Sequence, residues 1–259
     1  MPSVFKKLYH SLLNEKIRIQ IKKNQYRLQG FFRRGDKVEC NCCGKTYSSF
    51  LPFGNQSVRE NARCPNCGSL ERTRMLLWYL EHETRFFEPN IKVLHFAPED
   101  GLKKIFKERK SASTYINGDI DPNLADMQMD ITAIPFAENE FDYIICSHVL
   151  GHVPDEHKAL TEMYRVLKPG GVAIILSLLN KKDLPTIENP EIKSPEERLR
   201  IYGERDLLRL HGNDFQQRIE KAGFKVEPLD YTKSLKAETV ERFSMNNPER
   251  GMLFLSRKS

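Results

Sequence analysis

The sequence predicts an α/β protein built on a mainly parallel sheet. Strand-like apolar runs alternate with amphipathic helical runs from residue 91 onward, and acidic residues follow several of these runs. The glycine-rich turn at residues 169–171 leads into the strongest apolar run. A basic segment and a cysteine-rich segment precede this region. The 259 residues are enough for one well-buried domain with a small appendage, or for two modest domains.

Residues 1–35 are predicted to form a basic amphipathic arm. Ten basic and two acidic residues up to Lys37 give +8, so the rest of this +6 chain carries −2. Such a helix lies on anionic lipid or on nucleic-acid phosphate, and a solvated helix packed on its own domain is the open alternative. Its apolar face comprises Phe5, Leu8, Tyr9, Leu12 and Ile17.

The composition is that of an ordinary soluble globular protein, with 39% hydrophobic and 29% charged residues. No run approaches the roughly 18 uncharged apolar residues that a membrane span needs. The N-terminus lacks the uninterrupted apolar core of a secretory signal. We therefore expect a cytoplasmic protein, which the basic arm would hold at the inner face of the membrane.

Residues 36–75 are predicted to form a zinc ribbon, because two C-x-x-C-G turns stand a little over 20 residues apart. Each turn directs two thiolates at one tetrahedral metal, and its glycine lets the backbone fold back. Disulfides suit secreted proteins, and a redox dithiol would occur once, after a strand. Four thiolates leave no place for substrate, so the Zn²⁺ is structural. The predicted ligands are Cys40, Cys43, Cys64 and Cys67, with Cys42 and Cys146 left as free thiols.

The main domain is expected over residues 76–259. A final pair of strands close together in sequence could insert one antiparallel strand into the parallel sheet. The predicted helices span Leu102 to Arg109, His157 to Leu167 and Asp214 to Ala222. The predicted strands span Ile91 to Ala97, Tyr115 to Asp119, Phe141 to Ser147, Val172 to Leu179, Lys225 to Tyr231 and Met252 to Ser256.

The first strand runs into a turn without glycine in the stretch VLHFAPEDG, residues 93–101. A dinucleotide needs glycines there, because its pyrophosphate must approach backbone amides at a helix N-terminus. Pro98 has no amide hydrogen, and Glu99 would repel phosphate, so NAD, FAD and nucleoside triphosphates are disfavoured. S-adenosylmethionine is an adenosyl ligand without phosphates, and an acidic turn favours its sulfonium and ammonium charges.

Acidic residues at two later strand ends fit the same ligand. Asp119 closes the strand YINGD, where a carboxylate can accept both ribose hydroxyls. Asp130 in MQMDITAIPF is placed to accept from an adenine amino group, with the next backbone amide facing a ring nitrogen. Either carboxylate alone would more often be a solvated turn residue.

The run MDITAIPFAENEFDYIICSHVLGHVPDEHKALTEMYRVLKPGG resembles class I, type 11-like S-adenosylmethionine-dependent methyltransferases. FLPFG, RCPNCGSLERTR and VLHFAPE are similar to blocks of a bacterial subfamily with an N-terminal zinc ribbon. The resemblance covers nearly everything from about Gly35 onward and implies a Rossmann-like, seven-stranded methyltransferase sheet. Gly151 and Leu207 depart from the Glu and His expected there. The implied cofactor-binding residues are His95, Phe96, Ala97, Glu99, Asp119, Ile120, Asp130, Ile131, Cys146 and Ser147.

Methyl transfer is an in-line displacement that depends on alignment, and a base helps when the acceptor is a hydroxyl. His148, directly after a strand, is the candidate base, with a backbone-bonding role as its alternative; His152 is expected to be structural. Residues 181–212 form an acceptor-side insertion of mixed charge and three prolines, or else a solvated surface excursion. Its candidate acceptor-side residues are Asp206, Arg209 and His211.

These features predict methyl transfer to a polar small molecule, such as a saccharide of a cell-surface glycan. The first alternative is an rRNA or tRNA methyltransferase whose ribbon and arm bind phosphate, although no aromatic stacking platform is evident around the ribbon arginines. The second alternative is a non-catalytic scaffold that binds the cofactor.

Overall fold

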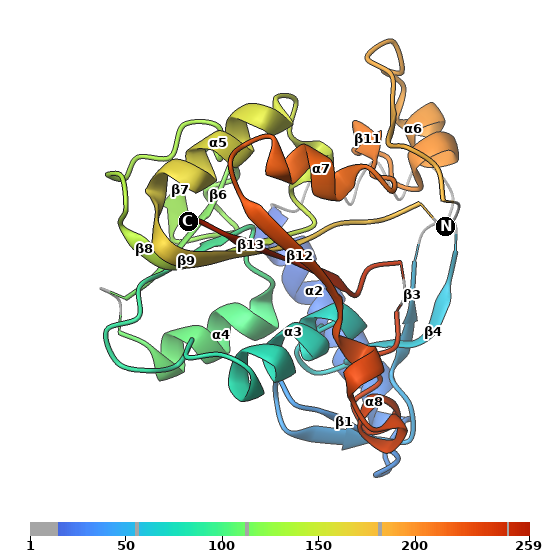
Figure 1. The fold of residues 1–259 in the computed structure, drawn as a ribbon. Coiled ribbons are helices and arrows are strands. Elements are labelled where there is room, and N and C mark those ends of the chain that lie inside the picture. The colour runs from blue at the N-terminus through green and yellow to red at the C-terminus, as the bar shows by residue number, and fades with distance from the viewer. Residues whose placement is uncertain (1–14, 55–56, 112–113, 181–182, 248) are drawn as a thin grey trace.

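The structure is a computed structural model that describes residues 15–54, 57–111, 114–180, 183–247 and 249–259 (Figure 1). The predicted apolar face of the N-terminal arm lies largely outside these residues, since four of its five members precede residue 15. Helix α2 (Glu15–Phe31) covers the described part of the arm. No helix within the described ranges is long and apolar enough to cross a bilayer.

A seven-stranded sheet forms the centre of the molecule, in the order β12-β13-β9-β8-β5-β6-β7. Strand β13 is antiparallel to both of its neighbours, and the other pairs are parallel. This confirms the predicted sheet, with its single antiparallel strand near one edge. The strands are β5 (Val93–Phe96), β6 (Tyr115–Asp119), β7 (Met127–Gln128), β8 (Phe141–Ser147), β9 (Leu167–Leu176), β12 (Lys225–Asp230) and β13 (Met252–Arg257).

Helices cover both faces of this sheet, as a parallel sheet requires. On one face, α3 (Glu71–His82) and α4 (Asp100–Arg109) share an apolar cluster with Val93, Ile145 and Ile174. On the other, α5 (Glu156–Val166) and α7 (Phe215–Glu220) share a cluster with Leu94 and Ile175. Alternate strand residues thus enter opposite cores, which fixes the register of each strand.

Several element boundaries differ from the expectation, and two of these differences have a clear local cause. Helix α5 begins one residue early because the Asp155 side chain accepts a hydrogen bond from the Lys158 amide at 2.9 Å and caps the helix. Strand β9 begins at Leu167 rather than Val172, because Leu167 already pairs with Phe141 and the Gly170 amide donates to the Lys258 carbonyl.

The cysteine-rich segment consists of two antiparallel hairpins, β1–β2 and β3–β4. Its Val38, Phe50 and Cys64 belong to the same apolar cluster as Met75 and Leu253 of the main domain. The ribbon and the sheet therefore share one continuous core. The hairpin strands are β1 (Val38–Cys40), β2 (Lys45–Tyr47), β3 (Leu51–Phe53) and β4 (Arg59–Arg63).

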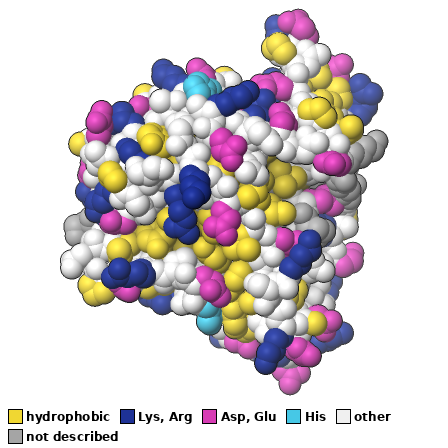
Figure 2. Space-filling model, in the orientation of Figure 1, with side chains coloured by type: hydrophobic (Ala, Val, Ile, Leu, Met, Phe, Trp, Pro, Cys, Tyr) yellow, Lys and Arg dark blue, Asp and Glu magenta, His cyan; other side chains and the backbone are white. Residues whose placement is uncertain are grey.

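The insertion after β9 projects from the body next to α7 (Figure 1). It contains β10 (Ile187–Glu188), α6 (Pro195–Tyr202) and β11 (Arg209–Leu210), with β10 and β11 paired antiparallel. The remaining helices are α8 (Ala237–Arg242) and two 3₁₀ helices, Leu150–His152 and Tyr231–Ser234. On the face seen in Figure 2, basic and acidic side chains are interspersed, so the surface charge there is mixed.

Arg74 of α3 fastens the ribbon to the C-terminal part of the chain. Its guanidinium is fully buried and donates to the carbonyls of Ala62 at 3.0 Å and Ser69 at 2.8 Å on the ribbon side. It also donates to the carbonyls of Phe243 at 2.6 Å and Ser244 at 2.7 Å. One side chain thus pairs four backbone carbonyls, two of them in buried bonds, from two distant segments.

We expect Arg74→Met to reduce the free energy of unfolding by about 3–5 kcal/mol, because several buried carbonyls lose their donor. Urea denaturation measures this loss. Arg85→Met is the control, since Arg85 is 78% exposed and bonds only a neighbouring glutamate. A loss below about 1 kcal/mol for Arg74→Met would contradict the role assigned to this side chain.

Candidate active site

A cavity of about 750 Å³ opens at the carboxyl ends of β5 to β8. Strand β5 has β6 on one side and β8 on the other, so the connections leave it in opposite directions there. Ligands of open α/β sheets bind at such a switch point. The cavity is lined by Phe96, Ala97, Gly118, Asp119, Ile120, Met129, Asp130, Ile131, Thr132, His148, Val149, His152, Val153, Pro154, Asp155, Lys158 and Asp206.

The turn after β5 offers little to a phosphate. Ala97 adopts the left-handed conformation, φ +46°, and its amide already donates to the Gly118 carbonyl at 2.9 Å. Pro98 has no amide hydrogen at all. Gly118 lets the strands approach closely, because a Cβ there would lie 2.8 Å from the Cβ of Met129. The turn therefore lines the cavity, but the backbone of Ala97 and Pro98 cannot donate a hydrogen bond to a ligand.

Two predicted carboxylates lie on the cavity wall. The Asp119 Oδ1 accepts from the amide of Asp121 at 2.8 Å, and the Asp130 Oδ1 accepts from the amide and hydroxyl of Thr132, both at 2.8 Å. Each carboxylate thus uses one oxygen to hold its own turn. The second oxygen is the one suited to a ligand hydroxyl or amino group, and Ile120 and Ile131 supply apolar contacts beside them.

Four predicted cofactor residues lie behind the cavity wall instead of on it. His95 is fully buried, with Nδ1 3.0 Å from the Tyr115 hydroxyl, and the Ser147 hydroxyl donates to Glu99 at 3.3 Å. Burial acts to raise the pKa of Glu99, but His95 and Arg72 together hold it below its usual value. Cys146 packs in the core against α5, and burial raises its pKa to about 12.

Of the three acceptor-side candidates, only Asp206 lines the cavity. The buried Arg209 donates to the carbonyls of Leu150 at 2.7 Å and Val153 at 2.6 Å. His211 is buried between the Ser177 hydroxyl and the Glu156 carboxylate, each at 2.6 Å. The expectation that Arg209 and His211 face the acceptor is therefore corrected: both fasten the insertion to the sheet.

His148 lines the cavity at the end of β8. Its backbone is left-handed, φ +57°, which is uncommon for a side chain of this size and places the ring beside the switch point. Burial, and then the positive charges of Arg72 and Arg250, lower its pKa well below the usual value. The ring is therefore neutral near pH 7, and its buried Nε2 has no partner.

His152, expected to be structural, also lines the cavity. Its Nδ1 lies 3.2 Å from the backbone carbonyl of Asp206 and 3.6 Å from the Asp206 carboxylate. A carbonyl only accepts, so this contact assigns the proton to Nδ1 and leaves Nε2 able to accept one. The sequence did contain a signal for this position: His152 stands four residues after His148, and His148 directly follows a predicted strand.

The two departures from the family pattern touch each other. A Cβ on Gly151 would lie 2.6 Å from the Cδ2 of Leu207, and the Leu208 amide donates to the Gly151 carbonyl at 2.9 Å. Leu207 thus fills the space that a side chain at position 151 would need. This contact and this hydrogen bond hold the insertion against the start of the 3₁₀ helix at Leu150.

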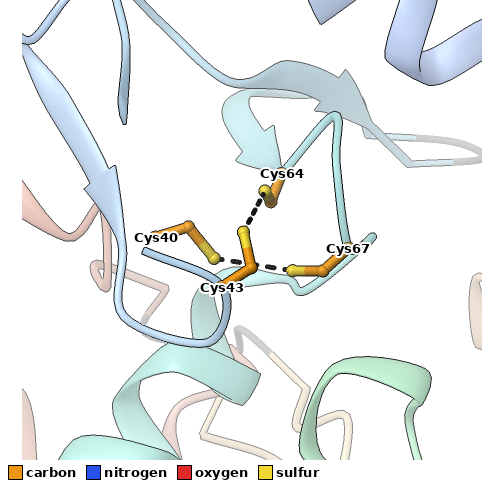
Figure 3. Close-up of side chains that lie close together, drawn as sticks. All are labelled: Cys40, Cys43, Cys64 and Cys67. Atoms are coloured by element: carbon orange, nitrogen blue, oxygen red, sulfur yellow. Dashed lines mark hydrogen bonds between the residues drawn. The ribbon is translucent and has the colours of Figure 1, made fainter. Parts of the chain in front are cut away.

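The four predicted zinc ligands converge in the ribbon (Figure 3). The Sγ atoms of Cys40 and Cys67 are 3.5 Å apart, and those of Cys43 and Cys64 are 3.7 Å apart. A tetrahedral zinc with Zn–S of about 2.3 Å requires S···S separations of about 3.8 Å. The sulfur positions are therefore compatible with one Zn²⁺, and the Cys42 sulfur stands outside the cluster.

A second, basic cleft of about 570 Å³ lies between α2, the ribbon and the start of α4. The Arg63 guanidinium lies 4.1 Å from the ring centre of Phe53 and 4.9 Å from that of Tyr26. This corrects the expectation that no aromatic rings accompany the ribbon arginines. The cleft also includes Lys23 and Arg27, so these two cations of the arm face their own domain.

Comparison with known proteins gives one family match, the methyltransferase domain, over residues 86–175. The UbiE ubiquinone/menaquinone biosynthesis C-methyltransferase of Klebsiella pneumoniae is 50% identical over 54 residues, 21% of this chain and 22% of that protein. The demethylmenaquinone methyltransferase of Renibacterium salmoninarum is 39% identical over 75 residues, 29% of this chain and 27% of that protein. The chain thus matches only about a quarter of the length of these curated relatives.

Two solved structures can be superposed on most of the chain. A putative methyltransferase from Bacillus halodurans aligns with 18% identity and a TM-score of 0.44, over 66% of this chain and 94% of that one. The phosphoethanolamine N-methyltransferase 2 of Haemonchus contortus, in complex with S-adenosyl-L-methionine, aligns with 17% identity and a TM-score of 0.45, over 71% and 52%.

The sheet order, the switch-point cavity and its two acidic strand ends define an α/β protein suited to an adenosyl ligand without phosphates. Residues 86–175 therefore contain the matched methyltransferase domain, and the seven-stranded sheet fits the Rossmann-like methyltransferase fold.

We expect the purified protein to contain about one zinc per chain. Cys64→Ser should lose the metal and fold poorly, because the ribbon shares its core with the sheet. Cys42→Ser is the matched control, a buried cysteine inside the other C-x-x-C-G turn whose sulfur is not in the cluster, and it should keep the zinc. Metal analysis by mass spectrometry checks both, and a wild-type protein without zinc would contradict the assignment.

Proposed function

We propose that this enzyme transfers the methyl group of S-adenosylmethionine to a hydroxyl of a polar acceptor, and that the acceptor is a saccharide of a cell-surface glycan. One observation carries this proposal: His148 and His152 line the same cavity as Asp119 and Asp130. Groups suited to a donor nucleoside and groups suited to an acceptor hydroxyl thus meet in one space.

S-adenosylmethionine, when bound, supplies an electrophilic methyl group on a sulfonium. Asp119 would accept the ribose hydroxyls, and Asp130 would accept from the adenine amino group. The neutral His148 would accept a hydrogen bond from the acceptor hydroxyl and orient it. His152 would take the proton at Nε2, since Asp206 holds Nδ1 and stabilises the charged ring.

The rim of the cavity favours a hydroxyl-rich acceptor. Thr132, Asp155, Lys158 and Asp206 surround it with polar groups of both charges, which can bond a saccharide from several directions. The relatives with quinone-related names share only 54 to 75 residues with this chain. So short a match does not support the inference that this chain acts on the same acceptor as those relatives.

We expect His152→Gln to lower kcat about 100-fold, within the usual range for loss of a general base, and to leave binding of S-adenosylhomocysteine within twofold. His157→Gln is the matched control, an exposed histidine five residues away that does not line the cavity. Formation of S-adenosylhomocysteine is measured with a panel of saccharides and glycolipid precursors.

Full activity of His152→Gln would contradict the assigned base. Turnover with any acceptor would exclude a non-catalytic scaffold. Turnover with RNA and with no saccharide would contradict the saccharide acceptor and favour an RNA methyltransferase.

That second candidate is an RNA methyltransferase, which the basic cleft supports. Arg63 lies beside Tyr26 and Phe53. The guanidinium can bind a phosphate, and the two rings offer surfaces on which a base can stack. RNA binding should then weaken steeply with salt and fall further in Arg63→Met. Salt-independent binding would count against this candidate.

A further inference from the structure

The C-terminal end of α2 carries a small apolar patch on the molecular surface. Among the described residues ten large apolar side chains are exposed, and three of them fall within residues 28–32. These three, which we call the α2 patch, are Leu28, 63% exposed, Phe31, 53% exposed, and Phe32, 79% exposed. Single exposed apolar residues are common on protein surfaces, but exposed apolar residues that cluster mark an interaction surface.

The packing of α2 turns this patch away from the rest of the protein. On one side of the helix, the Tyr26 ring centre lies 4.9 Å from the Arg63 guanidinium. Gly30 is buried on the same side, where an added Cβ would lie 2.6 Å from the Cβ of Pro65. The helical members of the α2 patch fall on the opposite side of the helix, because they are two residues or one residue away from Tyr26 and Gly30. The helix is thus held on the zinc ribbon and presents the α2 patch to solvent.

Cations adjoin the α2 patch. Residues 20–37 contain six basic residues and one acidic residue, which gives +5. The Arg34 guanidinium lies 3.9 Å from the ring centre of Phe31, so one positive charge stands directly beside the patch. Arg34 and Lys37 are exposed, and neither forms an ion pair within the described part of the chain. The chemical complement of exposed cations beside apolar side chains is the surface of a bilayer with anionic head groups.

The apolar side chains favour a bilayer over RNA. An unpaired base stacks on the flat face of a ring, but Leu28 has no ring and Arg34 already covers Phe31. The rings of Phe31 and Phe32 meet edge to face, with their centres 5.6 Å apart. The boundary between head groups and acyl chains requires only apolar side chains with cations beside them, and the α2 patch provides both.

We propose that the α2 patch, together with Arg34 and Lys37, docks the enzyme on an anionic membrane surface. The sequence placed the apolar face of the arm mainly before residue 15, and this contact lies at the other end of α2. Because α2 is held on the zinc ribbon, docking there would bring the ribbon close to the bilayer. Docking does not depend on which acceptor the enzyme methylates, so it can fail while the proposed function stands.

Cosedimentation of the full, zinc-loaded chain with vesicles tests this proposal. We expect binding to vesicles of equal parts phosphatidylglycerol and phosphatidylcholine, and much weaker binding to phosphatidylcholine alone. Leu28→Gln/Phe32→Gln should weaken binding to the anionic vesicles about 10-fold or more, because two apolar side chains leave the interface. Arg34→Gln should weaken it about fivefold, as for one cation at an anionic surface. The controls Leu124→Gln and Arg85→Gln, at an exposed leucine after β6 and an exposed arginine after α3, should stay within about twofold of the wild type.

The altered side chains are exposed, so the variants should keep the wild-type melting temperature. If the double variant melts lower, Phe32→Gln alone replaces it, with a smaller loss of vesicle binding. A wild-type chain that does not sediment with the anionic vesicles, or unchanged binding in the variant, would overturn the proposal. Without vesicle binding, RNA binding lost in the variant would assign the α2 patch to nucleic acid, and a dimer that the variant dissociates would assign it to a second copy of the chain.

Discussion

Two backbone positions in the turn after β5 determine which ligand the cavity can hold. The Ala97 amide is already bonded to the Gly118 carbonyl, and Pro98 has no amide hydrogen. A phosphate at a strand end is normally held by free amides of this kind. With no free amide at these two positions, the acidic residues determine the ligand: Asp119 and Asp130 favour an uncharged nucleoside, and Glu99 favours a positively charged group.

Helix α3 carries two arginines whose surroundings differ. Arg74 and Arg72 lie two residues apart and so point in different directions from the helix. Arg74 donates hydrogen bonds to four carbonyls, whereas two buried nitrogens of Arg72 have no acceptor. The first arginine joins the ribbon to the main domain. The second lies beside the turn after β5, with its Nε 3.7 Å from the Glu99 carboxylate.

Local patterns predicted most of the sheet and part of the site. Alternating apolar runs gave the strands, and the paired C-x-x-C-G turns gave the sulfur cluster. Asp119 and Asp130 could be placed because each directly follows a strand, and the ends of parallel strands meet at one edge. Helix α3 was missed: almost every position from Thr73 to Leu80 is buried, so no polar stripe marks it.

Residues whose partners are distant in sequence were assigned less well. Arg209 and His211 resemble acceptor-side groups in the sequence, but carbonyls and a carboxylate more than 50 residues away take up their polar atoms. His152 gains its place through Asp206, 54 residues later. Such pairings come from tertiary packing, which no local pattern reveals.

The most direct measurement is a competition between ligands at the switch-point cavity. S-adenosylhomocysteine should bind the purified chain, NADH and ATP should fail to displace it, and Asp119→Asn should weaken it by about 10-fold or more. Displacement by NADH or ATP, or unchanged binding in Asp119→Asn, would contradict a cavity built for a phosphate-free adenosyl donor.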